Sequence, residues 1–406
     1  MVYDVVVENF PKAVIMRFSF LLALLPLALA APSKRATPAP LHVPRSTGDN
    51  LIEGKYIVKM YDNAVEDSLR TLHSSMAAEP DHIYTAPGFK GFASALTAEE
   101  VETLQNHPDV EFIEQDSIMS INAYVTQSGS TWGLARISHK SRTAAGYVYD
   151  SSAGSGTCAY IIDTGIYTAH SEFEGRATWL ANFADTTNSD GNGHGTHVAG
   201  TVGSKTYGVA KATKLYAVKV LNAGGSGTTS GVVAGMNFVT SDVATRSCPN
   251  GAVANMSLGG SSSTAINSAV RAMVSANVFL AVAAGNSNTD AASTSPAGEP
   301  QACTIGATTS SDARASFSNY GSVVDVFAPG QDVLSTWNSG GTNTISGTSM
   351  ASPHVAGLGA YLLALEGFKA PQTLCSYIAS IGTSGVLSGV PSGTVNKVAF
   401  NDNPSG

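Results

Sequence analysis

Charged residues are scarce in this chain of 406 residues: Asp, Glu, Lys and Arg together make up 13%, where about a quarter is usual for a soluble protein. The 22 basic residues are outnumbered by 30 acidic ones, which gives a net charge of −8. The chain also contains 41 glycines and 43% hydrophobic residues. This composition argues against a coiled coil, a disordered acidic chain and a nucleic-acid-binding protein, because a phosphate backbone is bound mainly by basic residues.

Long apolar runs are also lacking after residue 30, since none approaches the 18 uninterrupted apolar residues of a membrane span. The shorter run at residues 18–29 follows Met16-Arg17 and ends in the small-x-small pattern Ala28-Leu-Ala30. This pattern predicts a secretory signal peptide over residues 16–30. The alternative, a buried core helix, would need partners that the proline-rich residues 31–44 do not provide. We therefore expect a secreted, extracellular protein, and we interpret residues 1–15 as an artefact of the start site.

Cysteine is rare as well, and the four residues present are far apart in the sequence. None belongs to a CxxC pair or to a Cys/His spacing that is typical of zinc sites. An even, widely spaced set suits two disulfides in an exported protein and four buried thiols in a protein that stays in the cell. The four are Cys158, Cys248, Cys303 and Cys375.

The charge is distributed unevenly and divides the chain into two pieces. Residues 1–122 contain 9 basic and 16 acidic side chains, a net charge of −7, and residues 123–406 contain 13 and 14, a net charge of −1. Residues 50–120 predict a compact α+β unit with strands at 56–60, 89–96 and 110–116 and helices at 65–77 and 98–106. Thr97 is the expected N-cap of the second helix. The unit contains no nucleophile–base pair, so we expect a structural or inhibitory role.

From Trp132 onward, short apolar runs bounded by Gly, Asn, Asp or Ser alternate with helical stretches. Such runs are typical of buried parallel strands. The pattern predicts a doubly wound α/β fold with a mainly parallel sheet, in which ligands bind at the carboxyl ends of the strands. The expected strands are residues 158–163, 214–220, 252–257, 278–284 and 302–307, and the expected helices are residues 196–203, 229–245, 264–276 and 352–365.

Three motifs at strand and helix ends contain chemically capable side chains. Asp163 ends a predicted strand in Asp-Thr-Gly, His194 opens a helix in Gly-His-Gly-Thr-His, and Ser349 opens a long apolar helix. Nucleophilic catalysis needs a hydroxyl, a base that takes its proton and a group that orients the base. The start of a helix also offers free N–H groups and a positive dipole end to an oxyanion. Asn286 ends another apolar run and could supply a second oxyanion donor.

Each motif alone is weak, but their order in the chain is specific. The order Asp, His, Ser is one of three known chain orders for a catalytic triad. The order found in α/β-hydrolases is excluded, because His354 is the only histidine after Ser349 and no acid lies between them. An aspartic protease would need a second Asp-Thr/Ser-Gly. His194 and His197 could together bind a metal, but the glutamate of H-E-x-x-H is missing, and we expect His197 and His354 to be structural.

With Ser257-Leu-Gly-Gly260 and Ala283-Ala-Gly-Asn286, these motifs make the region from Trp132 to about Phe400 resemble the subtilisin-like serine peptidases of the secreted fungal proteinase K type. The unit at residues 50–120 is similar to the inhibitory propeptide of such enzymes. The resemblance implies that residues 31–122 act as intramolecular chaperone and inhibitor and are removed near Asn122-Ala123. Residues 123–406 would then form the peptidase domain. The implied catalytic residues are Asp163, His194, Ser349 and, as oxyanion donor, Asn286.

The same resemblance implies how substrate would bind. Ser257, Leu258, Gly259 and Gly260 would form an exposed edge strand that pairs with an extended substrate, and Gly225-Ser-Gly227 would face it. The small residues Ala283, Ala284 and Gly285 suggest a permissive, apolar pocket for the residue before the cut. Thr229 stands where the proteinase K branch has a tyrosine, which implies a more open pocket for the residue four before the cut.

The resemblance also pairs Cys158 with Cys248 and Cys303 with Cys375, and it implies one structural calcium ion. The ligands would be the backbone carbonyls of Pro300 and Ala302 and the carboxylate of Asp325. The alternative is that Asp325 only caps a turn. Lys140 and Val386 occupy the positions of the family's second, weaker calcium site, so we expect that site to be absent. No organic cofactor is expected.

We therefore predict a secreted serine endopeptidase with broad, apolar-leaning specificity, made as a self-cleaving precursor. Its expected partners are protein and peptide substrates and its own propeptide, and we expect a monomer without a membrane span. The alternatives are a non-catalytic secreted binding protein on a peptidase fold, and a zymogen that stays inert until a partner cuts it. Asn255-Met-Ser257 matches the N-glycosylation pattern, but it lies in a strand that we expect to be buried.

Overall fold

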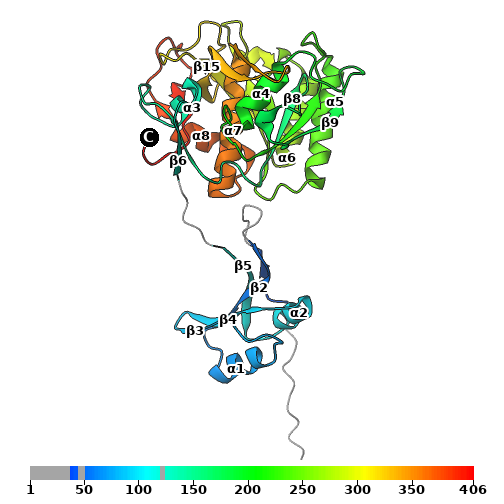
Figure 1. Ribbon diagram of the computed structural model, residues 1–406, viewed down its shortest axis with the longest axis vertical. Helices are drawn as coiled ribbons and strands as arrows, with labels where there is room; N and C mark the ends of the chain where they lie inside the picture. The colour runs from blue at the N-terminus through cyan, green and yellow to red at the C-terminus, as the bar shows by residue number, and fades with distance from the viewer. Residues whose placement is uncertain (1–36, 44–50, 119–123) are drawn as a thin grey trace, which may run out of the picture. The chain divides into compact units, whose positions relative to one another are not determined.

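The computed structural model describes residues 37–43, 51–118 and 124–406, and the chain divides into two compact units (Figure 1). The expected signal peptide at residues 16–30 and the expected cleavage point at residues 122–123 lie outside the described residues. Among the described helices, none combines the length and the apolar character needed to cross a membrane.

The smaller unit is an α+β domain built on a five-stranded sheet with the order β1-β5-β2-β4-β3. Both expected helices are present, and Thr97 caps α2 through a capping box with Glu100. The prediction of three strands was incomplete, because β3 pairs with β4 in a hairpin closed by Pro87 and Gly88, and β1 adds an edge. The elements are β1 (Leu41–His42), β2 (Leu51–Met60), α1 (Glu66–Ser74), β3 (His82–Ala86), β4 (Phe89–Ala95), α2 (Ala98–Gln105) and β5 (Val110–Ser117).

The larger unit alternates strands and helices, as the sequence predicts. Its elements are β6 (Tyr124–Gln127), α3 (Trp132–Ile137), β7 (Tyr147–Asp150), β8 (Cys158–Asp163), η2 (Ser171–Phe173), β9 (Ala177–Asn182), α4 (His194–Gly203), β10 (Lys214–Lys219), α5 (Thr229–Asp242), η3 (Val243–Thr245), β11 (Ala252–Met256), β12 (Gly260–Ser261), α6 (Thr264–Ser275), β13 (Val278–Ala283), η4 (Ala291–Ser293), β14 (Thr294–Ser295), β15 (Cys303–Thr308), β16 (Val326–Pro329), β17 (Val333–Thr336), β18 (Thr342–Ile345), α7 (Thr348–Glu366), α8 (Pro371–Ile381), β19 (Thr383–Ser384) and β20 (Lys397–Val398).

The main sheet has nine strands in the order β19-β20-β16-β15-β13-β11-β8-β10-β9. Every neighbouring pair from β20 to β9 is parallel, and only β19 runs antiparallel to its neighbour. The strand order changes direction at β8, since the chain continues to β9 and β10 on one side and to β11 and β13 on the other. Ligands of doubly wound sheets bind at such a switch point, and Asp163 is the last residue of β8.

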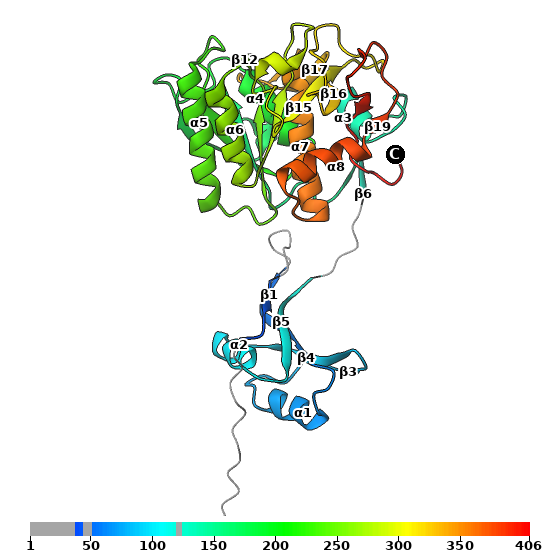
Figure 2. The ribbon, with the colours of Figure 1, turned by 180° about the vertical axis from the view of Figure 1, so that it is seen from behind.

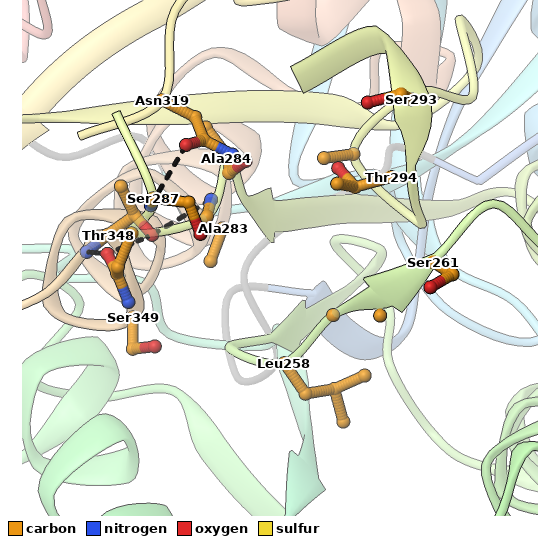
Figure 3. A pocket seen from close by; sticks show the side chains of 15 residues that line it. Leu258, Ser261, Ala283, Ala284, Ser287, Ser293, Thr294, Asn319, Thr348 and Ser349 are labelled. Carbon is orange, nitrogen blue, oxygen red and sulfur yellow. Dashed lines mark hydrogen bonds between the residues drawn. The ribbon is translucent and has the colours of Figure 1, made fainter. Parts of the chain in front are cut away.

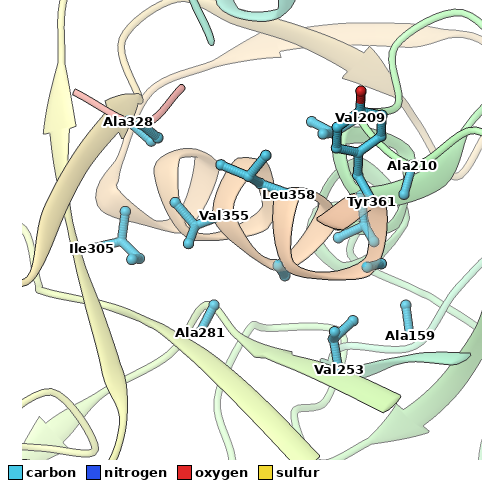
Figure 4. Close-up of a cluster of buried hydrophobic side chains, with 14 of the residues drawn as sticks. Ala159, Val209, Ala210, Val253, Ala281, Ile305, Ala328, Val355, Leu358 and Tyr361 are labelled. Carbon is cyan, nitrogen blue, oxygen red and sulfur yellow. The ribbon is translucent and has the colours of Figure 1, made fainter. Parts of the chain in front are cut away.

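Two apolar cores cover the two faces of this sheet. Alternate residues of β8 enter different cores: Ala159 and Ile161 belong to one, and Tyr160 and Ile162 to the other. Helix α7 runs through the first core (Figure 4), to which α4 also contributes. Helices α5 and α6, which Figure 2 shows next to each other, fill the second core. Because both faces are covered, the central strands β8, β11, β13 and β15 are buried at every position and consist mainly of apolar residues, and this is why their sequences could be recognised.

Two disulfides join strands of the main sheet to other segments of the larger unit. Cys158, at the start of β8, is bonded to Cys248, and Cys303, at the start of β15, is bonded to Cys375 of α8. These are the pairs that the resemblance implied, and none of the cysteines within the described residues is free.

Candidate active site

Three element ends bring an acid, an imidazole and a hydroxyl into one region. Asp163 ends β8, His194 is the first residue of α4, and Ser349 is the second residue of α7. His194 Nδ1 lies 2.7 Å from Asp163 Oδ1. The Asp163 side chain is fully buried, whereas 24% of the His194 side chain is exposed. The imidazole is therefore held by a carboxylate on one side and remains accessible on the other.

The environment of His194 favours its protonated form. Burial alone lowers the pKa of an imidazole, but the Asp163 carboxylate more than offsets this by charge and hydrogen bonding, with a smaller contribution from Asp190. The pKa of His194 is therefore raised above its ordinary value of 6.5. Such an imidazole can accept a proton from a neighbouring hydroxyl and become a stabilised cation.

Asp190 is a buried carboxylate that the sequence analysis missed. It connects Thr164, the residue after Asp163, to the start of α4, the helix that contains His194. Its Oδ1 accepts hydrogen bonds from Thr164 Oγ1 at 2.8 Å and from Gly193 N at 2.8 Å, and its Oδ2 accepts from Thr196 N at 2.9 Å. Thr164 Oγ1 in turn accepts from Gly195 N at 2.9 Å. The residues next to Asp163 and His194 are thereby fixed to each other. The only sequence signal for Asp190 is that an acid precedes a helix start.

Ser349 and the segment at Ser257 hold each other by two hydrogen bonds. Ser349 Oγ donates to the carbonyl of Ser257 at 3.2 Å, and Ser257 Oγ donates to the carbonyl of Ser349 at 2.7 Å. Within the described part of the chain, no hydrogen bond joins Ser349 to His194. Catalytic hydrogen bonds are often long or poorly aligned before substrate binds, so this geometry is compatible with a serine–histidine pair.

Asn286 is oriented by its own hydrogen bonds. Its Oδ1 accepts from Thr348 N and from Thr348 Oγ1, both at 2.8 Å, and the Thr348 hydroxyl also accepts from Gly285 N at 3.1 Å. Because Oδ1 is occupied, the Nδ2 donor faces the other way. Asn286 and Ser349 line the same cavity, in which Figure 3 shows Thr348 and Ser349 at one end. The cavity therefore contains an amide donor beside a hydroxyl.

Two cavities of about 470 and 420 Å³ share residues 258–260 as a common wall. The first contains Asn286 and Ser349, and the second contains His194 together with Gly225 and Gly227. The strands expected at residues 257–260 and 225–227 are absent except at Gly260, which begins β12 and pairs with Ser295 of β14. A strand requires a hydrogen-bonded neighbour, and the described residues supply none for residues 257–259 and 225–227.

The small residues expected to form a pocket do line the first cavity. Ala283 ends β13 and Ala284 follows it (Figure 3), and Gly285 comes next with φ +103°. A side chain at Gly285 would also meet the amide nitrogen of Asn319 at 2.4 Å, so glycine is required there. Thr229 lies in the wall of the second cavity. The site thus has a small-walled cavity on one side of residues 258–260 and a second cavity, with Thr229 in its wall, on the other.

The residues expected to bind calcium lie apart from the cleft. Ala302 is buried and Pro300 is exposed, and Asp325 Oδ2 accepts a hydrogen bond from Thr304 N at 2.8 Å. Burial raises the pKa of Asp325 to about 6. Its carboxylate lies within 4.8 Å of the sulfurs of Cys303 and Cys375, but these form a disulfide and cannot bind a metal. None of the ion pairs among the described residues includes Asp325.

His197 and His354 are buried and take no part in the cleft. Burial lowers the pKa of each to about 4, so both are neutral near pH 7. His197 Nε2 lies 3.0 Å from the carbonyl of Val333, and His354 Nδ1 lies 2.8 Å from the carbonyl of Met350. These contacts fit the expected structural role.

Comparisons with known proteins agree with this arrangement. Residues 154–381 match the model of the Subtilase family, and residues 55–122 match the Peptidase inhibitor I9 model. The chain is 58% identical over 395 residues to "Subtilisin-like serine protease AsES" of Sarocladium strictum, covering 96% of this chain and 100% of that one. It is 51% identical over 392 residues to "Proteinase R" of Parengyodontium album, covering 95% and 99%.

A solved structure, of a cold adapted subtilisin-like serine proteinase, superposes with a TM-score of 0.64 at 46% identity and covers 68% of this chain and 99% of that one. The fold, the cleft and these similarities lead to one conclusion. The chain belongs to the subtilase family, as a subtilisin-like serine protease that is made with an inhibitory I9 propeptide.

Proposed function

We propose that Asp163, His194 and Ser349 form the catalytic triad of this protease. Ser349 Oγ attacks the carbonyl carbon of the scissile peptide while His194 takes its proton, and His194 then protonates the leaving amine. Asp163 holds the imidazole in one tautomer and stabilises its cation. The observation that supports this most directly is the 2.7 Å contact between His194 Nδ1 and Asp163 Oδ1, in a cleft that Ser349 also lines. A non-catalytic binding protein would not need this contact.

Asn286 Nδ2 and the backbone N–H of Ser349 would receive the oxyanion. Replacing Asn286 by leucine should lower kcat by about 10²–10³-fold, the loss measured in subtilisin for such a donor. KM should change little, because the oxyanion forms only in the transition state. Asn286→Asp is the matched variant, since it keeps an acceptor for Thr348 and loses the donor, and it should lose as much activity. Steady-state kinetics that show a higher KM at unchanged kcat would contradict this role.

The precursor would be exported and would cleave itself. The signal-peptide pattern at residues 16–30 and the two disulfides support secretion, and the I9 match ends at residue 122, next to the proposed cut before Ala123. One chain supplies every residue of the proposed site, which fits a monomer. The small walls of the first cavity and Thr229 in the second support a broad, apolar-leaning specificity.

Expression of residues 16–406 tests this directly. We expect release of a new N-terminus near Ala123, together with casein hydrolysis that phenylmethylsulfonyl fluoride abolishes. This inhibitor reacts with an activated serine hydroxyl. The new N-terminus therefore reports on processing, and the inhibited casein hydrolysis reports on the nucleophile. Folded protein that shows neither would favour a non-catalytic binding protein, and cleavage only after another protease is added would favour a zymogen with an external activator.

We further propose one structural calcium ion held by the carbonyls of Pro300 and Ala302 and by Asp325. Carboxylate and carbonyl oxygens are the ligands that Ca²⁺ prefers. The largely buried carboxylate of Asp325 forms no ion pair within the described residues, so a cation there would compensate its charge. The ion would join the segment before β15 to the segment before β16 and take no part in the reaction.

Calcium should then stabilise the protein through a single site. Each tenfold increase in free calcium above saturation should add about 1.4 kcal/mol to the free energy of unfolding, and Asp325→Ala should remove this dependence. Glu366→Ala, which removes a carboxylate at the end of α7, should retain it. Calorimetric titration of the metal-stripped protein should show one site. Two bound ions would contradict the expected absence of the weaker site at Lys140 and Val386. No binding would contradict the proposed site at Asp325.

A further inference from the structure

The triplet Asn255-Met-Ser257, which matches a glycosylation pattern, is enclosed in the core beneath the nucleophile. The exposed fractions of Asn255 and Ser257 are 0% and 4%, so Asn255 cannot carry a glycan in the folded protein. Residues i and i+2 of an extended segment point to the same side, and Asn255 Nδ2 donates to Ser257 Oγ at 2.8 Å. Ser352 of α7, also fully buried, donates from Oγ to Asn255 Oδ1 at 2.7 Å.

These hydrogen bonds form a relay that runs from Ser352 through Asn255 and Ser257 to the carbonyl of Ser349. The needs of that carbonyl explain why the relay is present. In an α-helix, the N–H of residue i+4 donates to the carbonyl of residue i. For Ser349 that residue is Pro353, which lies inside α7 and has no N–H. Ser257 Oγ donates to this carbonyl instead, at 2.7 Å. The helix therefore depends on a side chain of another segment for a hydrogen bond that its own backbone cannot make.

The hydrogen bond to the Ser349 carbonyl also sets the direction of every other bond in the relay. A carbonyl can only accept, so the Ser257 hydroxyl must donate its proton to Ser349 and can only accept from Asn255. The amide of Asn255 must then turn Nδ2 toward Ser257 and Oδ1 toward Ser352, which has to donate. Each group has one possible role, so the relay holds a single arrangement.

We propose that Asn255, Ser257 and Ser352 are positioning residues. Ser257 supplies the donor that Pro353 denies to the Ser349 carbonyl, Asn255 and Ser352 orient Ser257, and together they fix the proposed nucleophile against the substrate-binding segment. The inference rests on the proposed function of Ser349. The backbone of Ser257 lies at the start of that segment, and its side chain holds the backbone of the nucleophile. One hydrogen bond, from Ser257 Oγ to the Ser349 carbonyl, would therefore fix the hydroxyl of Ser349 relative to the substrate carbonyl that it attacks.

Ser257→Ala removes the donor and leaves the backbone at residue 257 in place. We expect kcat, measured per titrated active site, to fall about tenfold, because a small displacement of a reacting group is costly. KM should stay within about twofold, because substrate would pair with the backbone. A second replacement, Pro353→Ala, returns an N–H that can reach the Ser349 carbonyl from within the helix. The double variant should therefore recover most of the lost kcat, and Pro353→Ala alone should act like the parent.

The rescue separates positioning from general damage, because an added packing defect cannot restore activity. If Ser257→Ala does not fold, the double variant should fold, since the carbonyl has a donor again; circular dichroism and thermal unfolding will show this. A Ser257→Ala enzyme with parental kcat, or a double variant no better than the single one, would overturn the proposal. Ser349→Ala is assayed in parallel, and parental activity in that variant would instead overturn the proposed function.

Discussion

Ser349→Ala should lower kcat for casein or a peptide substrate by about 10⁶-fold, the loss measured in subtilisin when its serine is removed. The large size of the effect follows from the mechanism, because without Oγ neither the attack nor the covalent intermediate is possible. Binding and the oxyanion donors remain, so a small residual rate above that of water should persist. The precursor should accumulate uncut, because the same hydroxyl would perform the cleavage before Ala123.

Adding active parent enzyme to the uncut Ser349→Ala precursor provides the control. Cleavage near Ala123 in this mixture would show that the variant is folded and that only its own chemistry is missing. Normal processing of Ser349→Ala in a host without other proteases would contradict self-cleavage. N-terminal sequencing distinguishes these results.

Asp163→Asn should lower kcat by about 10⁴-fold, the loss known for the corresponding change in a serine protease triad. The amide can present its N–H to His194 Nδ1 and so favour the wrong tautomer. The pH profile of the residual activity should also move. His194 must be neutral to accept a proton, so activity rises as the pH passes through its pKa, and the Asp163 carboxylate raises that pKa. Without the carboxylate, this rise in activity, the acidic limb of the pH profile, should shift to lower pH.

Asp185→Asn is the matched control for this shift. Its carboxylate lies 3.4 Å from Lys219 Nζ and pairs with that ammonium, so its loss should leave the acidic limb in place. An Asp163→Asn variant whose acidic limb stays where the parent has it would show that the carboxylate does not set the pKa of His194. Kinetics over pH 5–9 with one peptide substrate would provide the comparison.

The triad and Asn286 could be proposed from the sequence because each ends or begins an element with a strong local signal. Asp163 and Asn286 follow uninterrupted apolar runs, and His194 and Ser349 open helices. The connections between them could not be predicted, since they join residues far apart in the chain. Thr348 orients Asn286 from 62 positions away, and nothing near Asp190 in the sequence indicates that it connects Thr164 to α4.

Two kinds of fold prediction were incomplete for different reasons. The hairpin strand β3 is short and mostly exposed, so it lacks the apolar signal of a core strand, although Pro87-Gly88 is a typical turn pair. The resemblance implied strands at residues 257–260 and 225–227, which would pair with an extended substrate. Of these residues only Gly260 is in a strand, and the proposed partner of the others is the substrate, not another segment of the chain.

The location of Ser349 in α7 ties the proposed nucleophile to the interior of the larger unit. Ser349 is the second residue of this helix, and the helix fills the core of one sheet face. A molecule in which α7 has lost its packing would therefore also lose the position of the proposed nucleophile. Loss of activity on heating should then coincide with loss of the core.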